Sequence, residues 1–93
     1  MFITMSIHYP HKSAKTKLRE SMHRFKAAVT DCDGFIEGHV LEDENSNKMM
    51  GLIKWKSKTH MMEHAHLSAE AVKHDDFKTW EKFPPEVYYL NDV

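Results

Sequence analysis

Four short segments of the chain combine apolar and polar residues in the manner of β-strands, and in the first of them the apolar residues Ile3, Met5, Ile7 and Tyr9 fall on one face. The first segment is Phe2–Tyr9, which ends before a proline. Two further segments, Phe35–Asp43 and Met49–Lys56, are separated by polar residues only and predict a hairpin. Glu86–Leu90 predicts the last strand. In the third segment one face carries Met49, Gly51, Ile53 and Trp55.

Between these segments the apolar residues recur every three or four positions, which predicts two helices. The first helix is expected to begin at a Ser13 cap and to end before Gly34, a residue suited to left-handed backbone. Its apolar face carries Ala14, Leu18, Met22, Phe25 and Val29. The second helix is expected to begin after Ser57, another cap, and to continue as far as Phe83. Pro84-Pro85 then ends it.

The order β-α-β-β-α-β predicts an α+β fold of the ferredoxin-like type, as one domain over residues 1–93. This fold has a four-stranded antiparallel sheet with both helices on one face. The other face, which includes Met50 and Leu52, is then left uncovered. Because so short a chain buries only about 60% of its unfolded surface, we expect a second copy to cover this face in a homodimer.

The overall composition excludes several classes of partner. Lysine and arginine total 13, and aspartate and glutamate total 14, with a pI of about 6.7. A nucleic-acid-binding domain usually has a high pI and a dominant basic face, so no nucleic acid is expected. The single cysteine, Cys32, excludes an internal disulfide and fits the cytoplasm, where we expect the protein. No segment approaches the roughly 18 apolar residues of a membrane span, so no membrane is expected.

Four of the eight histidines lie between Trp55 and His74. His60 and His64 are four residues apart, a spacing at which two imidazoles on a helix can chelate a metal ion. A zincin site requires a glutamate directly after the first histidine, whereas Glu63 directly precedes the second. We therefore predict no metal site and expect His60 and His66 to lie on a solvated face.

His64 and His74 are predicted to face a pocket between the helices and the sheet. A histidine has an ordinary pKa of about 6.5 and can remove a phenolic proton as a general base. Aromatic side chains would give such a pocket flat apolar walls. The candidate pocket residues are Trp55, Trp80, Tyr9 and Met62. Core packing is the simpler interpretation of the two tryptophans.

Two local motifs resemble those of the antibiotic biosynthesis monooxygenase family of dimeric α/β-barrel proteins. Asp33-Gly34-Phe35 is similar to the family's PGF motif, with the proline absent. Trp55-Lys56-Ser57, followed by Met61-Met62 and His64, is similar to its W-x-S motif, apolar residues and H-x-x-S motif. The resemblance implies a homodimeric α/β barrel. It also implies a monooxygenase that acts on an aromatic or quinone-type molecule without a tightly held cofactor, with His64 or His74 as the base.

The same resemblance leaves two alternatives open. One is a ligand-binding or structural dimer without catalysis. The other is a haem-binding or haem-degrading protein with His74 as the iron ligand. The haem-degrading relatives have a tryptophan at the position of His64, and their asparagine on the first strand has no counterpart in residues 2–9.

Overall fold

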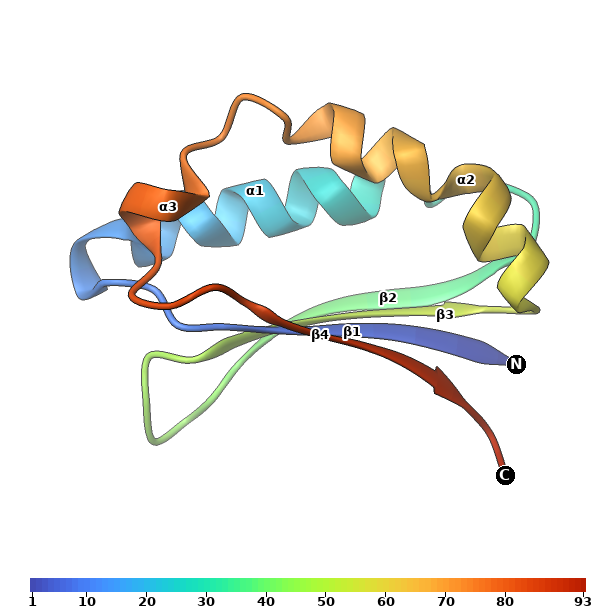
Figure 1. The fold of residues 1–93 in the computed structure, drawn as a ribbon, viewed down its shortest axis with the longest axis horizontal. Helices are drawn as coiled ribbons and strands as arrows, with labels where there is room; N and C mark the ends of the chain where they lie inside the picture. Colours follow the sequence, from blue (N-terminus) through green and yellow to red (C-terminus); the bar gives the residue numbers. More distant parts are fainter.

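All the helices lie on one face of a single four-stranded sheet (Figure 1). The computed structural model describes residues 1–93. Each predicted strand is confirmed, with observed ends within one residue of the predicted ends. In chain order the elements are β1 Phe2–His8, the 3₁₀ turn η1 Lys12–Ala14, α1 Lys15–Ala27, β2 Phe35–Glu42, β3 Met49–Trp55, α2 Lys58–Ala71, α3 Phe77–Trp80 and β4 Glu86–Asn91.

The strands pair in the order β2-β3-β1-β4, and every pair is antiparallel. The register places Phe2 opposite both Trp55 and Asn91, and His8 opposite Met49. A β-bulge between Phe35 and Glu37 interrupts the pairing of β2 with β3. This topology confirms the predicted ferredoxin-like α+β fold.

Alternate residues of the inner strands face the helices, as the third segment predicted. On β3 the helix-facing residues Met49, Ile53 and Trp55 are buried. They belong to two separate groups of core residues. One group contains Phe2, Val29, Ile53, Trp55 and Met61, and the other contains Leu18, Met22 and Met49. Since Trp55 pairs with Phe2 and Met49 pairs with His8, the two groups lie at opposite ends of β1.

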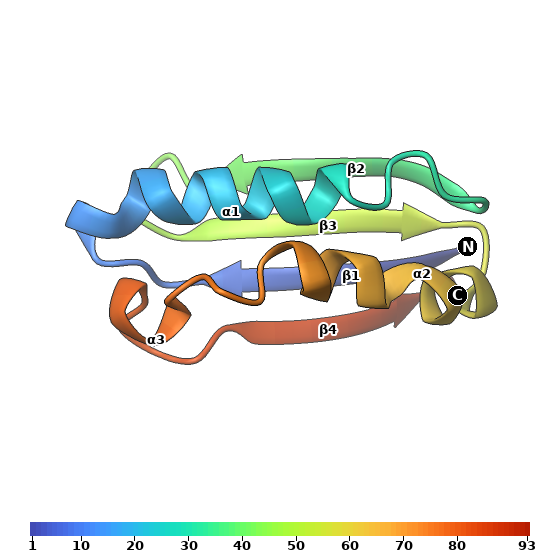
Figure 2. The same ribbon diagram turned by 90° about the horizontal axis from the view of Figure 1, so that it is seen from above.

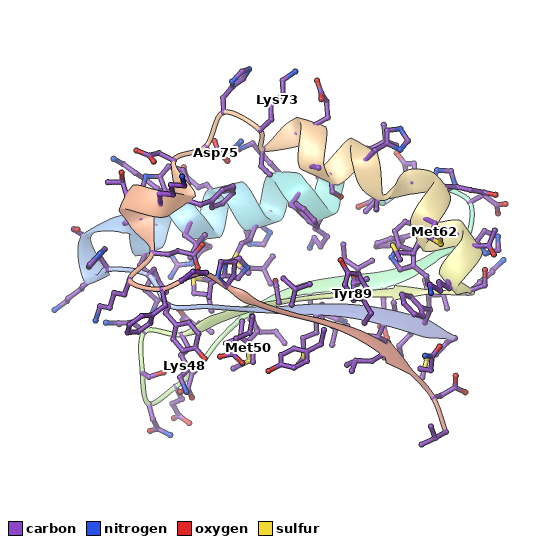
Figure 3. The ribbon with its side chains drawn as sticks, viewed as in Figure 1. Lys48, Met50, Met62, Lys73, Asp75 and Tyr89 are labelled. Atoms are coloured by element: carbon purple, nitrogen blue, oxygen red, sulfur yellow. The ribbon has the colours of Figure 1, made fainter.

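The face of the sheet opposite the helices is open. Met50 lies on this side (Figure 3), as do the residues that share its side of the neighbouring strands. Several of them are large and apolar and keep considerable exposure, such as Leu41 at 46%, Tyr88 at 40% and Leu90 at 37%. Only 15 of the 93 residues are buried, so the chain on its own covers little of its apolar surface.

The first helix differs from its predicted limits. Ser13 lies in the 3₁₀ turn and does not cap α1. The helix begins at Lys15 and ends at Ala27, and its N-cap residue, Ala14, forms no side-chain capping hydrogen bond. Gly34 does take the predicted left-handed conformation, with φ of 86°, but it follows a series of turns and is not the helix cap. A Cβ at this residue would lie 2.2 Å from the His60 ring. Glycine is therefore required both by the backbone and by contact with α2.

The second helix does begin after a Ser57 cap, whose Oγ accepts a hydrogen bond from the backbone N–H of His60 at 3.2 Å. The prediction that it continues to Phe83 is wrong, because α2 ends at Ala71 and only the short α3 follows. Asp75, in the turn between α2 and α3, contacts two residues of α1. Asp75 accepts a hydrogen bond from Ser21 at 2.6 Å and pairs with Arg24 at 2.9 Å.

No helix of the structure combines the length and the apolar character needed to cross a membrane.

Candidate ligand-binding cavity

A cavity of about 490 Å³ lies between the sheet and the helices. Thirteen of the 23 residues that line it are hydrophobic, and they come from both layers. Val87 and Tyr89 line the β4 side, and Tyr89 projects between the sheet and the helices (Figure 3). These two side chains remain 52% and 64% exposed although they share a side with Ser6 and Thr4 of β1. The cavity therefore opens along β4, which the helices leave largely uncovered (Figure 2).

The cavity exists because the middle of the sheet carries small side chains on its helix-facing side. Thr4 and Ser6 on β1 and Gly51 on β3 all line it, and Ser6 pairs directly with Gly51. The large core residues are concentrated toward the two ends of the strands. Because bulky residues at the two ends support the helices, the small residues at the centre are only partly covered, with Cε of Met22 coming within 3.4 Å of the position of a Gly51 Cβ.

Trp55 forms one end of the cavity and is 1% exposed. Its ring contacts the edge of Phe35, with centroids 6.0 Å apart, and stacks on the His64 ring at 6.1 Å with 13° between the planes. His64 does not itself line the cavity. Its Nε2 is buried without a hydrogen-bond partner, because Oε2 of Glu63 is 3.9 Å away. His64 therefore contacts Trp55 but does not reach the cavity.

A connected set of polar side chains lines another part of the cavity. Nε2 of His8 lies 2.9 Å from Oγ of Ser6, and Nδ1 of His8 lies 2.9 Å from Oε1 of Glu81. All three residues line the cavity. The Glu81 side chain is only 2% exposed, and its Oε2 has no hydrogen-bond partner.

Of the four predicted pocket residues, only Trp55 lines the cavity. Trp80 packs against Phe77 at 5.7 Å, beside the core group that contains Leu18. Met62 is 65% exposed. Tyr9 is half-buried at the far end of β1, where its ring contacts Phe83.

The hydroxyl of Tyr9 donates to Glu86, as does that of Tyr88 at 2.5 Å. Donation to the Glu86 carboxylate raises the pKa of both tyrosines. The same two hydrogen bonds, first from Tyr88 and then from Tyr9, lower the pKa of Glu86. None of these groups lines the cavity.

His60 and His64 do not converge on a common point. Nδ1 of His60 lies 2.7 Å from Oγ of Ser57, and its Nε2 faces Asp33 at 3.6 Å, whereas the His64 ring stacks on Trp55. The structure contains no group of three or more side chains placed to hold a metal ion.

His74 is exposed in the turn after α2 and does not line the cavity. A haem held by His74 would therefore lie outside the helical layer and away from Trp55. The residues around His74 do not form an apolar slot for a porphyrin, since its neighbours Lys73 and Asp76 are charged and exposed. They do not fit a haem pocket.

The sequence did not point to Ser6, His8 and Glu81 as a group. Ser6 and His8 were recognisable as neighbours on one strand face, because they are two residues apart. Glu81 follows His8 by 73 positions and lies in a segment predicted to be helical, so no pattern associated it with them.

The comparisons with known proteins concern the fold. A scan of protein families finds no match to the sequence, and neither does a search of curated proteins. Solved structures do match over nearly the whole chain. Rv0793 from Mycobacterium tuberculosis has a TM-score of 0.84 at 14% identity, covering 99% of this chain and 94% of its own.

Two candidate antibiotic biosynthesis monooxygenases are also similar. The protein from Nitrosomonas europaea has a TM-score of 0.77 at 10% identity and covers 100% of this chain and 99% of its own. The protein from Deinococcus radiodurans has a TM-score of 0.78 at 16% identity and covers 100% of this chain and 93% of its own. The chain shares the fold of these solved structures. The sequence resemblance to antibiotic biosynthesis monooxygenases is thereby confirmed at the level of the fold.

Proposed function

We propose that the chain binds an aromatic small molecule that carries a hydroxyl group, and oxygenates it without a resident cofactor. The observation that carries this proposal is the cavity, whose lining is mostly hydrophobic and includes the hydrogen-bonded side chains of Ser6, His8 and Glu81. Its volume of about 490 Å³ lies within the range of about 300–1,000 Å³ that is usual for ligand pockets.

Cofactor-free oxygenation begins with the loss of a proton from the substrate. An aromatic hydroxyl that has lost its proton is electron-rich and can transfer an electron to oxygen, whereas the neutral form does so poorly. A site for this reaction therefore needs apolar walls that hold the ring and a proton acceptor beside its hydroxyl. Trp55, Met61 and Phe25 contribute such walls.

His64 enters this proposal through Trp55. The stacked His64 ring holds the indole plane at the end of the cavity, so His64 acts as a positioning residue. His64→Phe keeps a flat ring and removes both nitrogens, whereas His64→Ala removes the ring as well. If stacking matters, the Phe variant keeps the wild-type rate and the Ala variant does not. Equal losses in both variants would instead favour the base predicted from the sequence.

Oxygen consumption tests the proposed reaction. Wild-type protein, treated with a chelator, is mixed with a panel of hydroquinones and naphthols, and oxygen uptake is followed with an electrode. We expect uptake above the rate without protein for at least one compound. Ala65→Phe places a ring in the cavity and should abolish this uptake. Met62→Ala changes an exposed residue of the same helix and serves as the matched control.

Two results would contradict the proposal. The first is no uptake with any compound, combined with no binding of these compounds. The second is an Ala65→Phe variant that folds and consumes oxygen like the wild type. Binding without oxygen uptake would instead support the non-catalytic alternative, a ligand-binding dimer.

A second copy of the chain is the partner that we propose for the open face of the sheet. The exposed apolar side chains of this face, such as Leu41, Tyr88 and Leu90, give the surface its self-complementary character. Light scattering of a monomer, 11.0 kDa, would contradict the proposal. Leu52→Lys places a charge on this face and should produce that monomer. Leu67→Lys, at a 38% exposed residue of α2, should leave the dimer intact.

A further inference from the structure

Ser6, His8 and Glu81 form a continuous hydrogen-bonded chain that faces the cavity. The two links, Ser6 Oγ to His8 Nε2 and His8 Nδ1 to Glu81 Oε1, are both 2.9 Å long. When Glu81 is ionised it only accepts hydrogen bonds, and Nδ1 of His8 then donates to it. Nε2 of the neutral ring then accepts the hydroxyl proton of Ser6. This leaves the oxygen lone pairs of Ser6 as the end of the chain.

Glu81 is held in place by backbone contacts as well as by His8. Its Oε1 accepts a hydrogen bond from the Tyr9 N–H at 3.3 Å, and its backbone forms an isolated bridge with Pro10. The backbone N–H of Lys82 donates to the Tyr9 carbonyl at 2.8 Å. A buried carboxylate is costly unless it is paired, and the side chain that pairs with Glu81 is His8. A positive charge on His8 is therefore stabilised by a carboxylate that cannot move away.

Space for a ligand atom exists next to Ser6. Gly51 is its partner on β3, and a Cβ on Gly51 would lie 3.0 Å from the Ser6 Oγ. Gly51 itself places no side chain beside the hydroxyl, and the nearest other side-chain atom there is Cε of Met22, 3.4 Å from the position of that Cβ. Both residues line the cavity, so a hydroxyl of a bound ligand can approach the oxygen of Ser6.

The connectivity is that of a serine–histidine–carboxylate triad, but the surroundings do not suit acyl transfer. Acyl transfer requires backbone or side-chain donors aimed at the developing oxyanion. Ser6 lies within β1, an inner strand paired with both β3 and β4, so the backbone N–H groups of this strand serve the sheet. The arrangement is suited to moving a proton and not to forming an acyl-enzyme.

We propose that Ser6, His8 and Glu81 form the site that takes the proton from the hydroxyl of a phenolic or enolic ligand. The ligand proton passes to the Ser6 oxygen as the Ser6 proton passes to Nε2 of His8. The products are the ligand oxyanion and an imidazolium ion beside the Glu81 carboxylate. No electron is transferred in this step. The inference rests on the proposed function, because it requires the ligand to occupy the cavity.

Other ionisable side chains that line the cavity lie elsewhere on its wall. Lys26 projects from α1 toward Gly38 of β2, where its side chain would meet an added Cβ. His39 is half-exposed and faces Glu37 at 3.4 Å, and Tyr89 lies at the β4 opening. None of them is hydrogen-bonded to the side chain of Ser6, His8 or Glu81.

The ionisation of a bound probe tests the inference. The probe is 7-hydroxycoumarin, whose neutral and anionic forms absorb at different wavelengths, and its binding is measured separately by equilibrium dialysis. Wild-type protein should raise the ratio of anion to neutral probe about tenfold over that in buffer, which is about one pKa unit. His8→Gln should bind the probe and return the ratio to that in buffer. Glu81→Gln and Ser6→Ala should lower the ratio as well.

The variants separate the possible failures. Gly51→Ala keeps the hydrogen bonds among Ser6, His8 and Glu81 but crowds Ser6, so it should lower the ratio of anionic to neutral probe. Ser46→Ala, at an exposed turn, should leave this ratio unchanged. If His8→Gln binds the probe and keeps the wild-type ratio, the inference is overturned while the proposed function stands. If wild-type protein binds none of the phenols, the proposed function fails and the inference with it.

Discussion

The hydrogen bond from Ser21 to Asp75 predicts how much stability a Ser21→Ala variant should lose. Ser21 is 1% exposed, and its hydroxyl donates to the Asp75 carboxylate at 2.6 Å. A hydrogen bond to a charged group contributes about 1.5–3 kcal/mol. Asp75 is 15% exposed and keeps its contact with Arg24 in a Ser21→Ala variant, so we take the lower end, about 1.5 kcal/mol. For a domain of this size the loss lowers Tm by about 6–12 °C.

The same contact predicts how the loss depends on pH. The Ser21 hydrogen bond, followed by Arg24, lowers the pKa of Asp75 below its ordinary 3.8. A carboxyl group with a folded-state pKa below its unfolded value stabilises the protein above the unfolded value, and this stabilisation is lost as pH falls through the folded value. The difference between wild type and Ser21→Ala should therefore be full at neutral pH and shrink well below pH 3.8.

Urea unfolding at a series of pH values, at one fixed protein concentration, measures this difference. Ser46→Ala is the matched control, because Ser46 also donates to a carboxylate, Asp43, at 2.6 Å but at an exposed turn. It should change stability little. A Ser21→Ala variant that loses no more stability than Ser46→Ala, or that loses the same amount in acid as at neutral pH, would contradict this prediction.

Two further predictions concern α2 and its neighbours. Gly34→Ala should cost more than about 2 kcal/mol in urea unfolding, since a left-handed alanine costs about 1–2 kcal/mol and its Cβ would meet the His60 ring. A loss below that would show that the His60 ring moves aside freely. His64→Phe should raise the free energy of unfolding by about 1 kcal/mol, because it removes a buried nitrogen that has no partner and keeps a ring on Trp55. An unchanged or lower Tm in calorimetry would contradict this.

The strands and their order could be predicted because their signals are local. Each strand is a short segment rich in apolar residues, and polar or proline-containing segments separate the strands. Gly34 could be predicted to be left-handed for a similarly local reason, since few other residues adopt that backbone. The same pattern identified Trp55 as a helix-facing residue, and it lines the cavity.

The break between α2 and α3 could not be predicted in this way. Apolar residues occur on both sides of the break, at Val72, Phe77 and Trp80. The turn after α2 is held against α1 by a hydrogen bond from Ser21 to Asp75, across 54 positions. A periodicity carries no information about such a distant partner.

The polar side chains of the cavity could not be predicted as a group because they also depend on a distant partner. The empty space could not be predicted because it depends on which residues pair in the sheet. Glu81 reaches His8 only because its backbone pairs with the end of β1 at Pro10. Ser6 and Gly51 appear in the sequence as ordinary small residues of two strands. Their pairing at the centre of the sheet, between bulky ends, is what leaves room for a ligand.

The proposed function requires that an aromatic molecule with a hydroxyl group binds in the cavity. Calorimetric titration of 1-naphthol into wild-type protein and Ala65→Phe, at several temperatures, tests it most directly. We expect that one molecule binds per chain, with the negative heat-capacity change of apolar burial, and that Ala65→Phe abolishes binding. No binding to the wild type, or equal binding to Ala65→Phe, would contradict it.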